Sequence, residues 1–309
     1  MNPSHTSFGD TSFTPLVACA ALREAGLEVS PAQVRIEPRD DRWLVWLPDE
    51  RLAWFPANAK GRKRVDVDRR VLWLLVERCS FGVPRVLFES EQGWDVRAVV
   101  PGVCDPWGLY RRTLTDVALA RRLGAAMAAI LVEQHTRIAH ADVAGWLPTR
   151  PAWPEPSEQL RESLPQVIDD RGLLADIDRA LDAYDAVTVD AEDHVLVHGD
   201  LGLHNLSVDP ETTEVRGVFD YDEACWADRH HYFRYLIFHH ELDHALDAAF
   251  AVYEAALGRT LSRHRIRLYN AACAIGFLAF RRGVAPEERW CGRTLAEDLA
   301  WVRGALARI

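Results

Sequence analysis

Two segments of the sequence place oxygen-bearing side chains directly after strand-like runs. Asp200 follows residues 194–197 and Asp220 follows residues 215–219, while Asn205 lies in the stretch between them. Acidic residues at the ends of such runs are held side by side at the mouth of a site. Carboxylate oxygens are ligands that magnesium takes together with substrate phosphates, and a carboxylate that binds no metal can accept a proton from an attacking hydroxyl. The pattern therefore indicates a magnesium site beside a general base.

These residues and their spacing resemble a known family. His198-Gly-Asp200, Asn205 five residues later and Phe219-Asp220-Tyr-Asp222 are similar to motifs of the aminoglycoside phosphotransferase family, and the similarity extends into Ala227-Asp228. Members of that family are small-molecule kinases related in fold to protein kinases. The resemblance implies an α+β, bilobal protein-kinase-like fold, with a small β-rich N-terminal lobe and a larger, mainly helical C-terminal lobe.

The resemblance also implies a role for each matched residue. Asp200 corresponds to the catalytic base toward the substrate hydroxyl, and Asn205 and Asp220 to the Mg²⁺ ligands that hold the nucleotide phosphates. Phosphoryl transfer depends mainly on in-line positioning and on neutralising charge, which these groups supply.

Four neighbouring residues receive supporting roles. His198 is expected to shape the catalytic loop through hydrogen bonds, and Asp228 to support the local structure of the lobe. Asp222 and Glu223 are candidates for the metal site or for contact with the substrate.

The nucleotide-binding half departs from the family pattern. The turn at residues 37–41 contains no glycine, and Trp54 or a neighbour stands where relatives carry a lysine or arginine on the third strand. Lys60, Arg62 and Lys63 follow closely and are candidates for contact with the phosphates of ATP or GTP. By resemblance, the purine is expected to bond to the backbone of residues 98–100, which begin with Ala98 and end with Val100.

A second pattern points to different chemistry. His240-Glu-Leu-Asp-His244 matches the zinc-protease pattern, in which two histidines on one helix face bind zinc and the glutamate activates water. The surrounding segment is rich in histidine, and no further histidine follows at a suitable spacing. We therefore interpret the segment as an ordinary helix of the C-terminal lobe and keep a zinc hydrolase only as the weaker alternative.

Acidic residues of this region favour a cationic acceptor. Relatives use helices after the magnesium motif to line the acceptor pocket, and Glu241 is our tentative substrate contact there. The acidic candidates are Glu241, Asp243, Asp247, Glu287, Glu288, Glu297 and Asp298. The net charge of −10 agrees with a polyamine-like or amino-sugar acceptor.

The predicted elements place these residues between two lobes. Strands are predicted at residues 34–37, 42–47, 51–55, 84–89 and 94–100, with one helix at 64–79. Pro101-Gly102 ends this region, so we predict a nucleotide-binding lobe over 1–101 and a catalytic and substrate-binding lobe over 102–309.

The second lobe is predicted to be mainly helical. Helices are expected at 115–138, capped by Thr113 or Thr115, and at 157–169 and 173–186. A strand pair at 194–197 and 215–219 follows, and then three helices from residue 227 to the end.

Composition excludes several classes of protein. The chain has 309 residues, of which 49% are hydrophobic and 27% charged, as in globular proteins with a sizeable core. The acidic net charge argues against a nucleic-acid or anionic-membrane binder, and no apolar run is long enough to cross a membrane. The six cysteines form no Cys-x-x-Cys pair and no export signal is evident, so we expect reduced thiols in a cytoplasmic protein.

The sequence thus predicts a magnesium-dependent kinase that transfers the γ-phosphoryl group of ATP or GTP to a hydroxyl of a small cationic molecule. The expected acceptor is an antibiotic, either an aminoglycoside or a peptide of the tuberactinomycin type. The alternatives are a metabolic kinase for homoserine, choline, an amino sugar or a macrolide-like acceptor, and a nucleotide-binding protein without transfer activity. Acceptor, donor and oligomeric state stay open.

Overall fold

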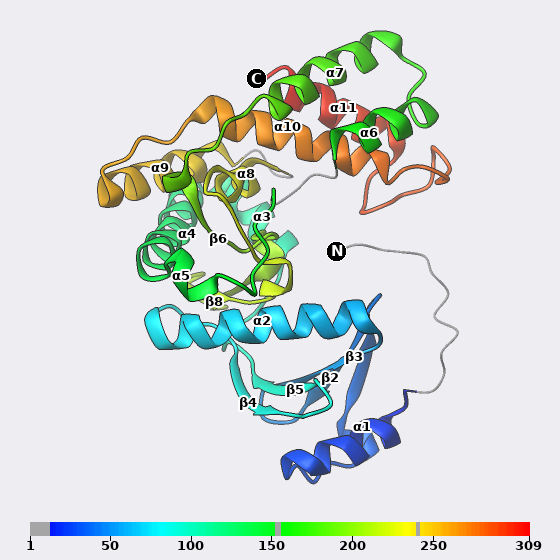
Figure 1. The fold of residues 1–309 in the computed structure, drawn as a ribbon, viewed down its shortest axis with the longest axis vertical. Helices are drawn as coiled ribbons and strands as arrows, with labels where there is room; N and C mark the ends of the chain where they lie inside the picture. Colours follow the sequence, from blue (N-terminus) through cyan, green and yellow to red (C-terminus); the bar gives the residue numbers. More distant parts are fainter. Residues whose placement is uncertain (1–12, 152–155, 239–241) are drawn as a thin grey trace.

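The N-terminal region is a five-stranded antiparallel sheet between two helices. The computed structural model describes residues 13–151, 156–238 and 242–309. The first elements are α1 (Pro15–Leu22), β1 (Arg35–Pro38), β2 (Arg42–Leu47), β3 (Arg51–Pro56), α2 (Ala59–Arg78), β4 (Arg85–Glu89) and β5 (Asp95–Ala98). The strands lie in the order β1-β2-β3-β5-β4. Figure 1 shows α2 between this sheet and the rest of the molecule, with α1 on the other side of the sheet.

The sequence predicted the five strands and α2 but not α1. The strands could be predicted because successive side chains point to opposite faces of the sheet. Ala53 and Phe55 of β3 face the core formed with α1, while Trp54 between them faces α2. The segment of α1 is apolar on all sides, so it has no helical period to detect. Helix α2 begins five residues before the prediction because Asn58 caps its first turn, accepting a hydrogen bond from the Gly61 N–H at 3.0 Å.

The C-terminal region contains most of the helices and two short β-ribbons. Its helices are α3 (Pro106–Thr115), α4 (Val117–Arg137), α5 (His140–Val143), α6 (Ser157–Ser163), α7 (Arg171–Asp185), α8 (His230–Phe238), α9 (Asp243–Leu257), α10 (Arg263–Ala279) and α11 (Leu295–Leu306). Its strands are β6 (His194–Val197), β7 (Leu206–Val208), β8 (Val215–Val218) and β9 (Cys225–Asp228).

Three predictions for this region were wrong in detail. The two predicted strands do not pair with each other: β6 pairs with β9, and β8 pairs with β7. The strands β7 and β9 have three and four residues, too few to produce a recognisable alternation. The cap of α4 is Asp116, which accepts from the Leu119 N–H at 2.8 Å, because Thr113 and Thr115 belong to α3. The described residues after 227 form four helices rather than three.

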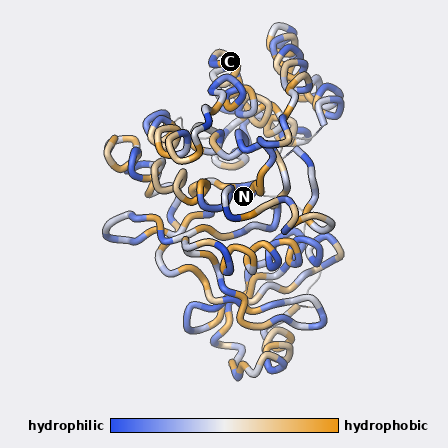
Figure 2. Tube along the Cα trace, turned by 60° about the vertical axis from the view of Figure 1, so that its left-hand side comes forward, coloured by the Kyte–Doolittle hydropathy of each residue, from blue (hydrophilic) through white to orange (hydrophobic). Residues whose placement is uncertain are grey.

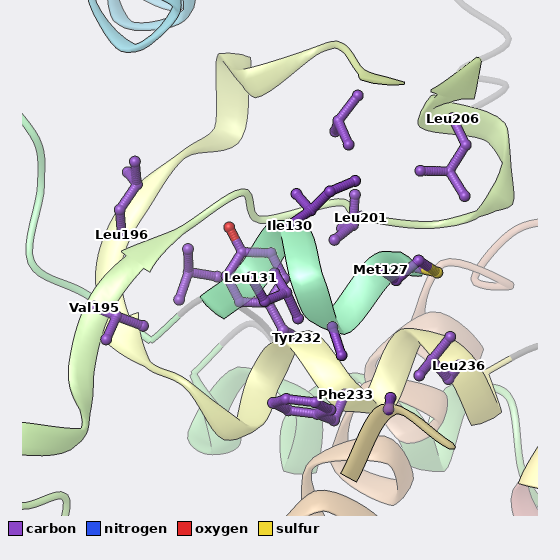
Figure 3. Close-up of a cluster of buried hydrophobic side chains, with 14 of the residues drawn as sticks. Met127, Ile130, Leu131, Val195, Leu196, Leu201, Leu206, Tyr232, Phe233 and Leu236 are labelled. Carbon is purple, nitrogen blue, oxygen red and sulfur yellow. The ribbon is translucent and has the colours of Figure 1, made fainter. Parts of the chain in front are cut away.

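A continuous apolar core lies below the loop between β6 and β7. Figure 3 shows side chains from α4, β6 and α8 meeting there, among them Leu131, Leu196 and Phe233. Along the trace, hydrophobic stretches alternate with hydrophilic ones, and many of the loops are hydrophilic (Figure 2). The six cysteines are free thiols, as predicted. No helix in the described part of the chain combines the length and apolar character needed to cross a bilayer.

Backbone hydrogen bonds join the β7–β8 ribbon to the sheet region and to the segment that follows it. The Val218 N–H donates to the Gly82 carbonyl of the sheet region at 2.9 Å, and Val103, just after that region, exchanges N–H···O bonds of 2.9 Å with Val208. Glycine is required at the first of these contacts, because a Cβ on Gly82 would overlap the carbonyl of Arg216 and one on Gly217 would overlap that of Gly82.

Candidate active site

The loop between β6 and β7 is held in one conformation by buried hydrogen bonds. Gly199 has a φ of +87°, and a Cβ there would overlap the carbonyl of Glu223, so the turn requires glycine. The ring of His198 accepts from the Asp200 N–H at 3.2 Å and donates from Nε2 to the Phe219 carbonyl at 3.0 Å. Burial lowers the pKa of His198 to about 4, so the ring is neutral and can donate and accept at once. These contacts agree with the supporting role we predict for His198.

The carboxylate of Asp200 lies at the surface of this loop. Its side chain is 43% exposed, and its Oδ2 is 3.0 Å from Nε2 of His204. Burial of the carboxyl raises its pKa, but the hydrogen bond from His204 and the charge interactions with His204 and other nearby groups together hold the pKa of Asp200 below its ordinary value. Asp200 is therefore ionised at neutral pH, as a proton acceptor must be. The sequence analysis did not predict this contact of His204 with Asp200. The spacing of four residues between them was the available signal.

Asn205 and Asp220 come together at one end of the β7–β8 ribbon. The Asn205 side chain donates from Nδ2 to the Asp200 carbonyl at 2.8 Å, which leaves its Oδ1 as an acceptor for a cation. The Phe219 N–H donates to the Asn205 carbonyl at 3.2 Å, so Asp220 follows the residue directly opposite Asn205. Asp220 itself adopts a left-handed conformation, with a φ of +74°, which aspartate tolerates better than most residues.

The surroundings of Asp220 fit a divalent cation. Burial raises the pKa of Asp220, and the negative charges of Asp68 and Asp200 add to the effect against the opposing charges of Arg42 and Arg64. A bound cation would reverse this penalty, since it stabilises the ionised carboxylate. Carboxylate and amide oxygens are also the hard donors that Mg²⁺ prefers. The donor set therefore suits the predicted metal.

Asp222 and Glu223 form ion pairs with arginines of the sheet region. Asp222 is buried and accepts from Nη2 of Arg42, and Nε of Arg64 lies 3.2 Å from the same carboxylate. Glu223 contacts Nη2 of Arg64 at 2.7 Å and Nη2 of Arg150 at 2.9 Å. Burial and the nearby charge of Asp220 raise the pKa of Asp222, against the two guanidinium groups. No local signal predicted these pairs, because up to 180 residues separate the partners.

Trp54 lies on β3, the strand on which, by the resemblance, relatives carry a cation. It is buried, and the guanidinium groups of Arg42 on β2 and Arg97 on β5 lie over its ring. Arg97 pairs with Asp68 on α2 and with Asp95. An ion pair between the sheet and α2 is thus present on β5, the strand next to β3.

The predicted nucleotide-binding residues lie in two places. Lys60 and Lys63 are exposed on the first turns of α2. Ala98 ends β5, and the Ser207 hydroxyl of the C-terminal region lies 3.4 Å from the Val100 carbonyl and 2.8 Å from that of Pro101. The Val99 N–H already donates to the Glu50 carbonyl at 2.9 Å, which leaves that amide committed within the sheet.

Asp228 lies at the end of β9 in a cluster with Asp193 and His230. The three side chains could geometrically hold a metal. Asp228, however, accepts from His230 Nδ1 at 2.6 Å and from the Tyr269 hydroxyl at 2.6 Å, and Arg265 pairs with both aspartates. Burial opposes its charge, but these bonds hold the pKa of Asp228 well below its ordinary value. The cluster is neutralised by protein groups, which agrees with the supporting role we predict for Asp228.

The acidic acceptor candidates differ in exposure. Asp243, Asp247, Glu287, Glu288 and Glu297 are exposed. Asp298 is fully buried between Arg281 and Arg293 and is therefore a structural ion pair. Glu241 and His240 lie outside the described residues, so the zinc pattern is represented only by His244, which is exposed on α9.

Several solved structures are similar in fold to this chain. Among solved structures, the GDP complex of wild-type aminoglycoside 2'-phosphotransferase-IIIa shares 14% identity and a TM-score of 0.69, over 94% of this chain and 97% of that one. Macrolide 2'-phosphotransferase type I shares 19% identity and a TM-score of 0.58, over 98% and 97%. Spectinomycin phosphotransferase APH(9)-Ia, with ADP and spectinomycin, shares 13% identity and a TM-score of 0.61, over 93% of each chain.

These likenesses confirm the predicted protein-kinase-like fold and leave substrates open, since one fold can serve many substrates. A search of the curated proteins found no match. The model of the phosphotransferase enzyme family, APH, matches residues 62–269, which is more than half of the chain. The predicted family and class of enzyme are confirmed: the chain belongs to the phosphotransferase enzyme family.

Proposed function

We propose that the protein transfers the γ-phosphoryl group of ATP or GTP to a hydroxyl of a small cationic antibiotic and thereby inactivates it. The observation that carries this proposal is the grouping of Asp200, Asn205 and Asp220 where β6 and β8 end and β7 begins. The solved neighbours named for aminoglycosides, spectinomycin and macrolides support an antibiotic acceptor. We further propose residues 1–101 as the nucleotide-binding lobe and residues 102–309 as the catalytic and substrate-binding lobe.

In this mechanism Asp200 accepts the proton of the acceptor hydroxyl as that oxygen attacks the γ-phosphorus. His204 keeps the carboxylate ionised and oriented, and the Asn205 amide fixes the loop by its bond to the Asp200 carbonyl. Asn205 Oδ1 and the Asp220 carboxylate would hold Mg²⁺, which supplies positive charge to the nucleotide phosphates. The exposed acids Asp243 and Asp247 on α9 are our proposed contacts for a cationic acceptor.

The test is nucleotide turnover against a panel of hydroxylated antibiotics. The panel holds aminoglycosides, spectinomycin, a tuberactinomycin peptide, macrolides, choline and homoserine, each assayed with ATP and with GTP in the presence of Mg²⁺. We expect acceptor-dependent release of ADP or GDP, and a loss of activity of about 100-fold or more in Asp200→Asn because its amide cannot take the proton. Asp178→Asn, at an exposed position of α7, is the matched control and should keep full activity.

The outcomes separate the alternatives. Turnover only with choline or homoserine would indicate a metabolic kinase. Binding of nucleotide without turnover on any acceptor would indicate a binding protein and contradict the proposal.

A further inference from the structure

Two buried arginines stack on Trp54 and differ in how their donors are used. The guanidinium carbon of Arg97 is 4.0 Å from the ring centroid and that of Arg42 is 4.6 Å. Arg97 donates from Nε and Nη2 to Asp95 at 2.6 and 2.9 Å, and from Nη1 to Asp68. Each nitrogen of Arg97 therefore has a carboxylate partner, as a structural ion pair requires.

Arg42 has a buried donor without a partner. Its Nη2 donates to Asp222, and its Nε lies 3.0 Å from Oδ1 of Asp41. Its Nη1 has no hydrogen-bond partner among the described residues, although Arg42 is only 6% exposed. A buried charged donor left unpaired costs free energy, and a ligand that brings an acceptor recovers that cost.

This open donor lies beside the proposed metal site. Asp222, the partner of Arg42, is two residues from Asp220, and the positive charge of Arg42 acts on the Asp220 carboxyl. Arg64 is committed elsewhere, because its Nη1 bonds Asp41 at 2.9 Å, its Nη2 contacts Glu223 at 2.7 Å and its Nε lies 3.2 Å from the carboxylate of Asp222. Arg42 is thus the arginine of this pair with a donor to offer to a ligand.

We propose that Arg42 contacts the phosphate chain of the nucleotide through its open Nη1 and so takes the place of the third-strand cation that Trp54 displaces. The inference rests on the proposed function, since it needs a nucleotide in the cleft. A guanidinium suits this role because it presents several donors in one plane to phosphate oxygens. The ring of Trp54 positions the group by a cation–π contact.

The test compares ligands with and without phosphates. Binding of adenosine, ADP, guanosine and GDP is measured by calorimetry with Mg²⁺ for the parent protein and Arg42→Gln. We expect Arg42→Gln to weaken the binding of ADP and GDP about 10- to 100-fold, which corresponds to the loss of one or two hydrogen bonds to a charged group. The affinity for the nucleosides should change less than about twofold. Equal losses for nucleosides and diphosphates, or no loss, would overturn the inference.

Controls assign the effect to this arginine. Arg35→Gln, on the neighbouring strand β1 with a side chain that is 65% exposed, should leave all four affinities unchanged. A double variant, Lys60→Ala with Lys63→Ala, tests the alternative contact. If it binds ADP and GDP more weakly while Arg42→Gln binds them normally, the phosphate contact belongs to α2 and the inference is wrong. If the parent binds neither diphosphate, the proposed function itself fails.

A second variant guards against misfolding. Arg42→Lys keeps the charge but not the planar donors, so it should fold and still lower the ratio of diphosphate to nucleoside affinity. An unchanged ratio in Arg42→Lys, with Arg42→Gln unfolded, would overturn the contact of the planar Nη1 donor with phosphate.

Discussion

Tyr232 connects the catalytic loop to the core through its buried hydroxyl. That oxygen accepts from the His198 N–H at 2.6 Å and from Nε2 of Gln134 at 2.5 Å. Gln134 also donates to the Leu196 carbonyl at 2.7 Å and accepts from the Tyr221 hydroxyl at 2.9 Å. One buried network thus sets the position of the residues that precede Asp200, and its members come from α4, β6 and α8.

Removing the Tyr232 hydroxyl should therefore cost more than removing that of Tyr221. Tyr232→Phe leaves two buried donors without this acceptor, and we expect a loss of about 1–3 kcal/mol in the free energy of unfolding. Tyr221→Phe leaves one acceptor unpaired and should cost about 1 kcal/mol. Urea denaturation of the parent and both variants measures the difference. An equal or reversed order would show that the network does not support the loop.

Helices α4 and α9 pack so closely that only a glycine fits at one of their contacts. On α4, a Cβ at Gly124 would overlap the backbone carbonyl of Ala245 on α9. Side chains can turn aside from such an overlap, but a carbonyl of a packed helix cannot, so the two helices must move apart if the glycine is replaced.

The substitution Gly124→Ala should destabilise the protein by about 1–3 kcal/mol in spite of alanine's better helix propensity. Gly304→Ala in α11 is the matched control, because its added Cβ meets no atom within 4 Å. That variant should gain about 0.5–1 kcal/mol. Thermal unfolding of the two variants gives the sign of each effect, and a stabilised Gly124→Ala would contradict the close approach of α4 and α9.

The elements and the motif residues could be predicted because their signals are local. Alternation in β2 and β3 and the spacing of Asp200, Asn205 and Asp220 are all visible within short windows. The pairing of β6 with β9 could not be predicted, since an apolar run of four residues does not determine which strand it pairs with. Arg42 likewise gives no sign of its contact with Asp222 until the fold brings β2 beside residues 221–223.

Buried histidines make the whole molecule sensitive to acid. His231 stacks on Tyr269 at 4.0 Å, and burial beside Arg234 lowers its pKa to about 3. Burial lowers the pKa values of His135 and His198 as well. Between the ordinary histidine pKa of 6.5 and these lower values, the unfolded chain binds protons that the folded chain does not. The contribution of these histidines to the free energy of unfolding therefore falls as the pH falls below 6.5, while the raised pKa values of Asp220 and Asp222 act in the opposite sense.

The variant His231→Phe should reduce this acid sensitivity while preserving the aromatic stack. Over about pH 6 to 4, its free energy of unfolding should fall less steeply than that of the parent, by about 1.4 kcal/mol per pH unit for one proton. Denaturant titrations across this range measure the slope, and those at pH 8 report any change unrelated to protonation. An unchanged slope would mean that His231 is charged in the folded protein.

The backbone contacts of the β7–β8 ribbon have a consequence for ligand entry. The Val218–Gly82 bond holds the ribbon to the N-terminal region, the Val103–Val208 bonds hold it to the segment just after that region, and Asn205 and Asp220 lie at one end of the ribbon. If the two proposed lobes turn apart about these contacts, the ribbon lies at the hinge, where displacements are smallest. Asn205 and Asp220 would then keep nearly the same relation to both halves of the protein in the open and the closed state, so that a metal ion could stay in place while substrates enter and products leave.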